Sequence, residues 1–394
     1  MKVLLAFDKF KGSLTAQEAC RLAEDALFEI QPDLSIEHAP LSDGGEGFCS
    51  ILTEGLGGEI RDYTVTYPEI HPGSGQIGYV PLAEVSDEVR SILKFPDKGI
   101  LAIIEMAQAA GHQLIQEKPR NPWNYTTFGV GEMIRYAIGE GCTHILMGMG
   151  GSATNDMGIG MLEALGLKAF GRDQQPISPI VPSKWNSIRE LKLDGTIENV
   201  PVCIACDVKN PLHGPNGAAA IYGPQKGLLP EGLNEMQLQM ERMDPLVRSV
   251  FEGNRLPSDT GGMGAAGGMP FGVSMAFDTH LVPGFELLCE ILKLDAKVEN
   301  ADWVLTGEGA VDLSSLSGKG PYSIVQRAFQ QRTKISIMGG KVFDDARESL
   351  NSKMPEVDVR QIGDPNASID ENISNEPENL KKTVQAAFGA LKLS

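Results

Sequence analysis

Glycines and small polar residues follow one apolar run of this chain in a way that suits a phosphate group. Residues 143–149 predict a buried strand, and residues 150–156 (Gly-Gly-Ser-Ala-Thr-Asn-Asp) follow it before a helical pattern begins. Glycines let backbone N–H groups approach an anion, and a helix N-terminus adds partial positive charge. The segment therefore predicts a phosphate-binding loop, with a plain strand-to-helix turn as the alternative.

Two known phosphate motifs can be compared with this loop. It is not a Walker A loop, because no Gly-Lys-Ser/Thr sequence closes it. The spacing Gly148-x-Gly150-x-x-Ala153 does fit the looser dinucleotide pattern, so the residues alone leave a nicotinamide cofactor open.

Charged residues lie among glycines directly after other apolar runs. The first of these clusters along the chain holds two lysines, which are suited to binding a phosphate or a carboxylate. The other clusters hold carboxylates, which are suited to binding Mg²⁺ or to acting as a general base. Each cluster alone also fits a solvated turn or a helix cap, but together they favour magnesium-dependent phosphoryl transfer. The residues concerned are Asp8, Lys9 and Lys11; Asp43 and Glu46; Asp207; and Glu308 and Asp312.

Two further segments offer backbone or lysine contacts to a ligand. Lys226, between Pro224-Gln225 and Gly227, is spaced to clamp a phosphate, with a structural turn as the alternative. Residues 261–269 contain five glycines and no charged side chain, so they suit either a backbone cradle for a ligand or close packing.

Composition and charge limit the classes of function. The 394 residues have a net charge of −18, which excludes nucleic-acid binding through a basic face. The six cysteines are scattered in apolar runs and the six histidines are dispersed, so neither a zinc site nor a hydrolytic triad is predicted. No signal peptide or membrane-spanning run is present, which predicts a cytoplasmic protein that binds no membrane.

The order of apolar runs predicts the elements that position these residues. Residues 3–7 and 35–39 alternate with helices, the first starting at a Thr15–Glu18 capping box, and this order implies a parallel sheet whose carboxyl ends collect ligands. We expect antiparallel strands within 60–105, helices at 126–138 and 228–253, and strands at 202–206, 303–305 and 335–338. Residues 166–200 read as irregular, 364–379 as an exposed loop, and 380–391 as a final helix.

The predicted fold class is α/β, with two lobes and the active site in the cleft between them. Residues 1–65, 122–165 and 285–394 are assigned to a Rossmann-like lobe, a parallel sheet with flanking helices. Residues 66–121 and 166–284 are assigned to a second, mixed α/β lobe.

Taken together and in this order, the motifs resemble the type I glycerate kinase family. The resemblance runs from residue 8 to about residue 320 and covers nearly the whole chain. Its segments are residues 8–14 (Asp-Lys-Phe-Lys-Gly-Ser-Leu), 42–47 (Ser-Asp-Gly-Gly-Glu-Gly), 149–156, 205–212 (Ala-Cys-Asp-Val-Lys-Asn-Pro-Leu), 223–227 (Gly-Pro-Gln-Lys-Gly), 264–269 and 306–309 (Thr-Gly-Glu-Gly).

The resemblance implies a kinase that moves the γ-phosphoryl group of ATP to D-glycerate with Mg²⁺, and it argues against the nicotinamide alternative. Bacterial members of this type are generally associated with 2-phosphoglycerate, which is the expected product, and 3-phosphoglycerate is the alternative. We assign catalysis to Lys11, Asp43 and Asp207, with Asp207 preferred over Asp43 as the base. Nucleotide phosphates are assigned to Gly150, Gly151, Ser152, Asn155, Asp156 and Lys226, the substrate to Asp8, Lys9, Gly267 and Gly268, and the metal to Glu308 and Asp312. Glycerate is the expected partner, and the protein is expected to be a monomer or a homodimer.

The sequence departs from the family pattern at two positions in one motif. The family usually has Arg and Gln where this chain has Ala310 and Ser314, and residues 337–341 (Ile-Met-Gly-Gly-Lys) replace a more usual Ala-Gly-Ser run. These departures keep two alternatives open: a kinase of another small hydroxy acid, and a catalytically weak ligand sensor on the same fold.

Overall fold

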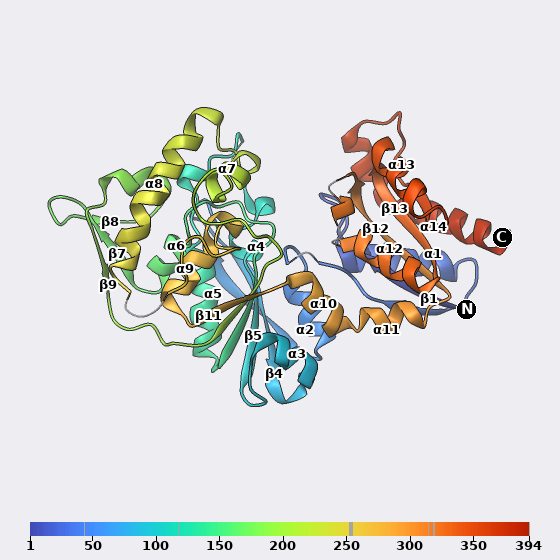
Figure 1. The fold of residues 1–394 in the computed structure, drawn as a ribbon, viewed down its shortest axis with the longest axis horizontal. Helices are drawn as coiled ribbons and strands as arrows, with labels where there is room; N and C mark the ends of the chain where they lie inside the picture. Colours follow the sequence, from blue (N-terminus) through green and yellow to red (C-terminus); the bar gives the residue numbers. More distant parts are fainter. Residues whose placement is uncertain (43, 117, 252–254, 314, 318–319, 394) are drawn as a thin grey trace. The chain divides into compact units, whose positions relative to one another are not determined.

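The chain folds into two compact units, and it crosses between them twice. The structure is a computed structural model that describes residues 1–42, 44–116, 118–251, 255–313, 315–317 and 320–393. Unit 1 comprises residues 1–43 and 288–394, so it contains both chain ends, and unit 2 comprises residues 44–287 (Figure 1). The mixed α/β class predicted from the sequence is confirmed.

Unit 1 is built on a parallel sheet. Its strands are β1 (Lys2–Phe7), β2 (Ser35–His38), β12 (Trp303–Val311), β13 (Lys334–Val342) and β14 (Asp358–Gln361), in the spatial order β14-β13-β12-β1-β2. All neighbouring pairs are parallel. The carboxyl end of β1 lies beside Gly307, because Phe7 is opposite Gly307, and β12 continues four residues further, to Val311.

Helices cover this sheet and bury its apolar side chains. They are α1 (Ala16–Phe28), α11 (Leu294–Glu299), α12 (Gly320–Gln331), α13 (Asp344–Lys353) and α14 (Ile369–Leu393), while α10 (Gly284–Leu292) spans the boundary with unit 2. The predicted capping box starts α1, because Thr15 accepts from the Glu18 amide and Glu18 accepts from the Thr15 amide. Helices α1 and α14 pack together on the face of the sheet that carries Leu5 and Leu305.

Unit 2 contains a larger, mixed sheet. Its strands are β3 (Glu59–Thr66), β4 (Pro72–Pro81), β5 (Ile100–Glu105), β6 (His144–Gly148), β10 (Val202–Ala205) and β11 (Thr279–Val282), in the order β11-β10-β6-β5-β4-β3. The first four in this order are parallel, whereas β4 and β3 are antiparallel. The helices are α2 (Phe48–Gly55), α3 (Asp87–Leu93), α4 (Ala107–Ala110), α5 (Phe128–Gly139), α6 (Ile159–Ala164), α7 (Ala218–Tyr222), α8 (Pro230–Arg248) and α9 (Met269–Ala276).

The predicted domain boundaries differ from the observed units. Residues 44–65 and 122–165 were assigned to the Rossmann-like lobe, but β3 and β6 are strands of the sheet in unit 2. The cause is the strand pairing: β6 lies between β5 and β10, so the glycine loop that follows it belongs to unit 2. A strand–helix alternation predicts parallel pairing but does not say which sheet a strand joins.

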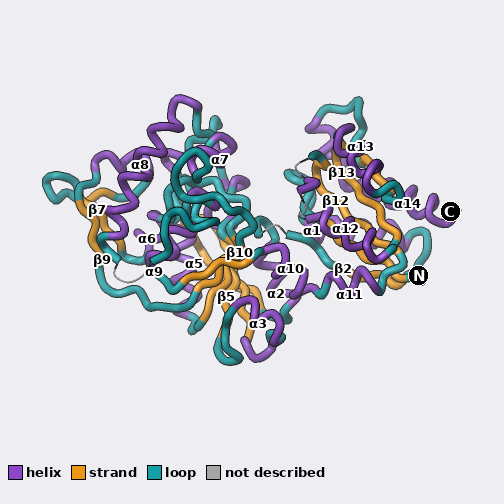
Figure 2. The backbone as a smooth tube through the Cα atoms, viewed as in Figure 1, coloured by secondary structure: helices purple, strands orange, loops and turns teal. Residues whose placement is uncertain are grey.

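Two segments predicted to be irregular form regular structure. Residues 166–200 contain a small sheet of β7 (Leu167–Phe170), β8 (Pro176–Ile177) and β9 (Glu190–Leu193), which Figure 2 shows apart from the six-stranded sheet. Residues 369–379 belong to α14, whose start is capped by Ser368: its hydroxyl accepts from the Glu371 amide, and its own amide donates to the Glu371 carboxylate. The described helices are all too short or too polar to span a membrane.

Candidate functional site

The glycine loop, residues 150–156, runs so close to another backbone segment that side chains are excluded. A Cβ atom at Gly150 would lie 2.5 Å from the amide nitrogen of Gly45, and the Gly150 amide donates to the Gly44 carbonyl over 2.8 Å. Two glycine-rich motifs that the sequence places at separate strand ends are therefore in contact within unit 2. Close packing alone requires these glycines.

Most of the glycine loop is buried. Gly151 is exposed and Gly150 is partly exposed, whereas residues 152–156 are buried. The chain around α4 holds the loop from one side, since Ala153 donates to the Ala110 carbonyl over 2.8 Å and His112 donates to the Gly151 carbonyl over 2.9 Å. The part of the loop that a phosphate can approach is thus its start.

Asp156 caps a helix inside the protein. Its carboxylate accepts from the amide and hydroxyl of Thr127, both over 2.8 Å, and from the amides of Gly158 and Gly160, both over 3.1 Å. Burial raises the pKa of Asp156, although these hydrogen bonds favour its charged form. Asp156 fixes the start of α6 and does not face solvent, and its phosphate contact stays a prediction. The buried Asn155 likewise does not face solvent.

Lys226 is also inside unit 2, at 1% exposure. It ends the 3₁₀ helix η5 (Pro224–Lys226), and its ammonium donates to the Ser152 hydroxyl over 2.9 Å and to the Thr154 carbonyl over 2.6 Å. Gly227 follows with a φ of +98°, and a Cβ there would lie 2.4 Å from the Arg120 carbonyl. The side chain predicted to clamp a phosphate is therefore bound to the glycine loop itself.

Gly267 and Gly268 pack directly against the same loop. A Cβ at Gly267 would lie 2.2 Å from the Thr154 carbonyl oxygen, and one at Gly268 would lie 3.0 Å from the Cα atom of Met157. The Met157 amide donates to the Gly267 carbonyl over 2.9 Å. Both glycines are buried, and this packing explains them without the predicted contact to substrate.

Asp207 follows β10, as the sequence predicts, and is half-buried. Both of its carboxylate oxygens lie within hydrogen-bonding distance of the Phe285 amide, at 3.3 and 3.2 Å. Phe285 is in the first turn of α10, so Asp207 stabilises the start of that helix. Asp43 lies outside the described residues.

In unit 1, residues 8–11 follow β1 at the carboxyl edge of the parallel sheet. The Asp8 amide donates to the Gly307 carbonyl over 2.9 Å, and its carboxylate accepts from the Lys9 amide over 2.7 Å. Asp8 is buried, Lys9 is half-buried and Lys11 is exposed. Lys11 is thus the cation of this segment that a dissolved anion can reach most readily.

Glu308 of β12 interacts electrostatically with this segment and with Asp312, which directly follows the strand. Burial, and then the negative charge of Asp8, raise the pKa of Glu308 to about 7; Asp312 also raises it, while Lys11 favours the charged form. Asp312 accepts from the Ser315 amide over 2.9 Å. Charged residues from separate motifs therefore lie close enough within unit 1 for their charges to interact with that of Glu308. They are Asp8, Lys11 and Asp312.

The crowding of carboxylates in unit 1 suits a divalent cation, which would relieve their mutual repulsion. Within the described residues, however, no group of three or more His, Cys, Asp or Glu side chains is placed to bind a metal ion. Proteins commonly bind Mg²⁺ through one or two carboxylates together with substrate phosphates.

Comparison with known proteins identifies the family. The sequence model described as "Glycerate kinase family" matches residues 3–392. The chain belongs to the glycerate kinase family. It is 32% identical over 389 residues to a "Glycerate kinase" of Haemophilus influenzae, covering 98% of this chain and 97% of that one. It is also 32% identical to the "Glycerate 2-kinase" of Escherichia coli K12, over 88% of this chain and 86% of that one.

A solved structure agrees with this result. It is named "putative glycerate kinase 2", from Salmonella typhimurium LT2, and the TM-score is 0.70 at 30% identity, covering 100% of this chain and 98% of the other. Membership of the glycerate kinase family makes the chain an enzyme of the phosphotransferase class, and it confirms the resemblance read from the motifs.

At Ala310, where the glycerate kinase pattern has arginine, the neighbouring strand supplies a lysine. Ala310 is exposed on β12, and its partner in the parallel register is Lys341 of β13. Glu308 is two residues before Ala310 and therefore points to the same face of the sheet. The Lys341 ammonium lies 4.6 Å from the ring centre of Phe343. A cation is thus present beside the position where the family has arginine, while Ser314 lies outside the described residues.

A charged cluster in unit 2 was not predicted from the sequence. Asp244 of α8 accepts from Arg248 over 2.6 Å and from the Ser258 hydroxyl over 2.5 Å, and it lies 2.8 Å from the His213 ring nitrogen Nε2. It ties the loop after Asp207 to residues 256–260, because the Leu212 amide also donates to the Ser258 carbonyl over 2.9 Å. The i,i+4 spacing of Asp244 and Arg248 indicates no more than a surface ion pair.

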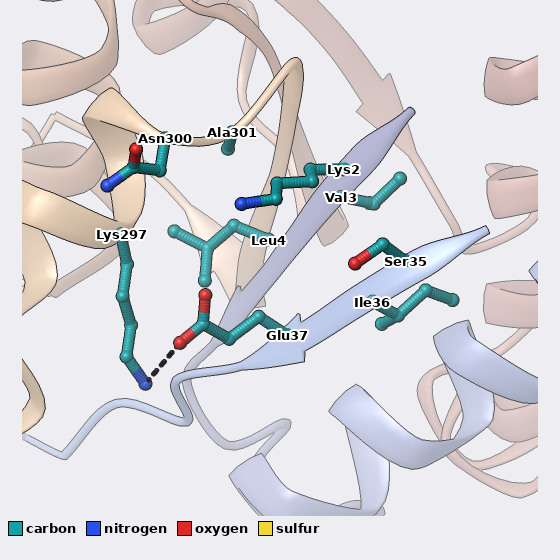
Figure 3. Close-up of a pocket in the computed structure, with 9 residues that line it drawn as sticks. All are labelled: Lys2, Val3, Leu4, Ser35, Ile36, Glu37, Lys297, Asn300 and Ala301. Atoms are coloured by element: carbon teal, nitrogen blue, oxygen red, sulfur yellow. Dashed lines mark ion pairs between the residues drawn. The ribbon is translucent and has the colours of Figure 1, made fainter.

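A pocket of about 220 Å³ lies elsewhere in unit 1 (Figure 3). It is lined by the first residues of β1 and β2 and by the end of α11, where Lys297 and Glu37 form an ion pair of 3.2 Å. Because the strands are parallel, this is the amino end of the sheet, opposite to Asp8 and Glu308. The pocket is therefore separate from the candidate site.

Proposed function

We propose that this protein transfers the γ-phosphoryl group of ATP to D-glycerate, with Mg²⁺, and releases 2-phosphoglycerate. The family match over residues 3–392 is the observation that carries the proposal. The carboxylate and lysine cluster of unit 1 and the glycine loop of unit 2 support it, since phosphoryl transfer depends on positioning and charge rather than on covalent catalysis. The name "Glycerate 2-kinase" of the Escherichia coli relative supports the 2-phosphate product.

In the proposed reaction the acceptor hydroxyl of glycerate attacks the γ-phosphorus atom, and the bond to the bridging oxygen of ADP breaks. The hydroxyl proton passes to a carboxylate, for which Asp207 is our first choice and Asp43 our second. Backbone N–H groups of Gly150 and Gly151 bind nucleotide phosphates. Lys11 neutralises charge on the transferring group or on the glycerate carboxylate.

The metal would be held by Glu308 and Asp312, with Asp8 nearby, and when bound it would offset the charge of the nucleotide phosphates. These residues fit the role because the negative charges of Asp8 and Asp312 add to burial in raising the pKa of Glu308, and a cation would oppose that effect. Asp8 and Lys9 also remain our candidates for contact with the substrate, since both follow β1.

A coupled assay tests the function directly. We would incubate the purified protein with D-glycerate, ATP and Mg²⁺, and couple the product to enolase and pyruvate kinase without phosphoglycerate mutase. Signal without the mutase is expected for the 2-phosphate product, and signal only after its addition would mean 3-phosphoglycerate. No signal in either case from folded protein would reject glycerate as the acceptor.

Replacing Asp207 tests its role as the base. Asp207→Asn keeps the shape and an oxygen acceptor for the Phe285 amide, so stability should change little, while kcat should fall by roughly a hundredfold or more, the range of general-base contributions. Asp278→Asn, at an exposed aspartate of the same unit, is the matched control. Near-normal turnover by Asp207→Asn would move the base to Asp43.

This chain has Ala310 where the family usually has arginine. That difference favours a second candidate function, a kinase of another small hydroxy acid. A screen of hydroxy acids in the presence of ATP, with ADP release as the readout, separates the two. Preference for an acid other than glycerate by at least tenfold in kcat/KM would support this second candidate.

A further inference from the structure

Three segments that are distant in sequence converge on the Thr154 carbonyl. Lys226 donates to this oxygen over 2.6 Å, and Gly267 packs against it so closely that a Cβ atom would lie 2.2 Å away. Thr154 itself is at the centre of the glycine loop and is fully buried. Its carbonyl is therefore fixed from both sides, by an ammonium and by a glycine.

The second contact of Lys226 reaches the start of the same loop. Its ammonium donates over 2.9 Å to the Ser152 hydroxyl, one residue after the exposed Gly151. Ser152 also forms a bridge to Gly111. One buried cation thus joins two points of the loop that are two residues apart, and it holds them at the distance its hydrogen bonds allow.

Several residues around Lys226 set its position. Gly223 and Gly227 bracket η5, and a Cβ at either would lie 2.4 Å from a carbonyl oxygen, that of Ala219 and of Arg120 respectively. Gly227 has a left-handed φ of +98°, which disfavours any other residue. The motif of residues 223–227 is thus explained by the packing that delivers Lys226 to the loop.

We infer that Lys226 is a positioning residue: from inside unit 2 it holds the glycine loop in the shape that binds nucleotide phosphate, and it does not contact the phosphate itself. The inference rests on the proposed function insofar as it names the ligand of the loop. A direct contact would need the ammonium to leave both acceptors and its buried site, with the Ser152 hydroxyl and the Thr154 carbonyl losing a charge-assisted hydrogen bond.

The electrostatic setting supports an internal role. Burial lowers the pKa of Lys226 to about 7, against the attraction of Asp156, which favours the charged form. Both charged groups are buried in the same unit, and Asp156 fixes the start of α6 directly after the loop. Lys226 and Asp156 therefore hold the two ends of the segment from Ser152 to α6.

The test compares Lys226→Met, Ser152→Ala and the double variant with the wild type. Lys226→Met keeps the length of the side chain and removes its donors, and Lys192→Met, at an exposed lysine of the same unit, is the matched control. Two quantities are measured: amide hydrogen exchange of residues 150–158, and kcat and KM for ATP and for glycerate.

If Lys226 positions the loop, the amide hydrogens of residues 150–158 exchange faster in Lys226→Met than in the wild type or in the control. The kcat/KM of Lys226→Met for ATP falls by roughly tenfold or more, and adding Ser152→Ala lowers it little further, because the two changes remove the same hydrogen bond. If Lys226 contacts phosphate directly, loop exchange stays at the wild-type rate and the two effects add. That result would overturn the inference, as would kinetics equal to those of Lys192→Met.

Two outcomes need separate treatment. If Lys226→Met does not fold, Ser152→Ala alone removes one acceptor without a charge, and an unchanged exchange rate in residues 150–158 would then overturn the inference. If the wild type does not phosphorylate glycerate, the proposed function fails, whereas the exchange comparison still tests the internal role of Lys226.

Discussion

The ammonium of Lys226 is in a place where its positive charge is unfavourable. Its pKa is lowered from 10.5 to about 7 in the folded protein, mainly by burial. Between these values the unfolded chain binds more protons than the folded one, so stability rises with pH through this window and is lost as pH falls through the folded pKa. The slope for one such group is at most about 1.4 kcal/mol per pH unit.

We therefore expect the free energy of unfolding of the wild type to increase relative to that of Lys226→Met as pH rises from about 7 to about 9. Urea unfolding at several pH values measures the difference, and Lys192→Met gives the background from the rest of the chain. Parallel pH curves for wild type and Lys226→Met would show that the buried lysine does not titrate in this window.

Asp244 offers a second test at a single residue. Burial favours its neutral form, but hydrogen bonds from His213, Ser258 and Arg248 hold the pKa of Asp244 below its ordinary value of 3.8. Its stabilisation is therefore complete above about pH 4 and is lost as pH falls through the lowered pKa.

Asp244→Asn should lower the free energy of unfolding at neutral pH by about 1.5–3 kcal/mol, the range for hydrogen bonds to a charged group. The exposed Asp259, in the segment that Asp244 holds, supplies the control Asp259→Asn, which should be close to neutral. Chemical denaturation measures both. Equal stability of the two variants would mean that the cluster around Asp244 contributes no more than a surface ion pair.

At the scale of elements, substitution of a glycine can distinguish a role in packing from a role in ligand binding. Gly267→Ala places a methyl group 2.2 Å from the Thr154 carbonyl at a φ of +71°, so both overpacking and backbone strain oppose it. We expect a loss of roughly 2–4 kcal/mol in the free energy of unfolding. Gly139→Ala, at the end of α5 with nothing within 4 Å, should be neutral or slightly stabilising. A Gly267→Ala protein of wild-type stability would favour the predicted ligand contact, rather than packing, as the reason for this glycine.

The sequence predicted elements well where a local signal existed. The capping box at Thr15 and Glu18 gave the start of α1 correctly, and the apolar runs gave β1, β6, β10 and β12. The helix at residues 369–379 was missed because Asn, Glu, Asp and Pro dominate its composition, although Ser368 and Glu371 had the spacing of a capping box.

The candidate site was predicted less completely, for a physical reason. Strand ends showed where Asp8 and Asp207 would lie, because carboxyl ends of parallel strands gather side chains. Glu308 lies within β12, one residue past the position that pairs with the end of β1. Residue type alone does not separate a lysine that meets solvent from one that is buried: Lys11 is exposed and Lys226 is 1% exposed. That difference arises from packing: Gly227 lies against Arg120, which is distant in sequence, and the Lys226 ammonium reaches Ser152 and Thr154.

At the scale of the whole molecule, the two units differ in whether they are formed from one continuous stretch of chain or from two. Unit 2 is one continuous stretch, residues 44–287, inserted into unit 1, whose two pieces supply neighbouring strands β1 and β12. Unit 2 also has its own apolar core, which includes Met147, Ile204 and Phe271. A continuous segment with its own core is the kind that folds alone.

We therefore expect a fragment of residues 44–287 to fold cooperatively, as measured by far-UV circular dichroism and a single sigmoidal urea transition. A fragment of residues 66–287, which starts at the boundary expected from the sequence, is the control. It lacks α2 and nearly all of β3, so it leaves the β4 edge unpaired and the Cys49 amide no longer donates to the buried Glu105. If the shorter fragment folds as cooperatively as the longer one, residues 44–65 are not part of the cooperative core of unit 2, and the pairing of β3 with β4 does not decide where the unit begins.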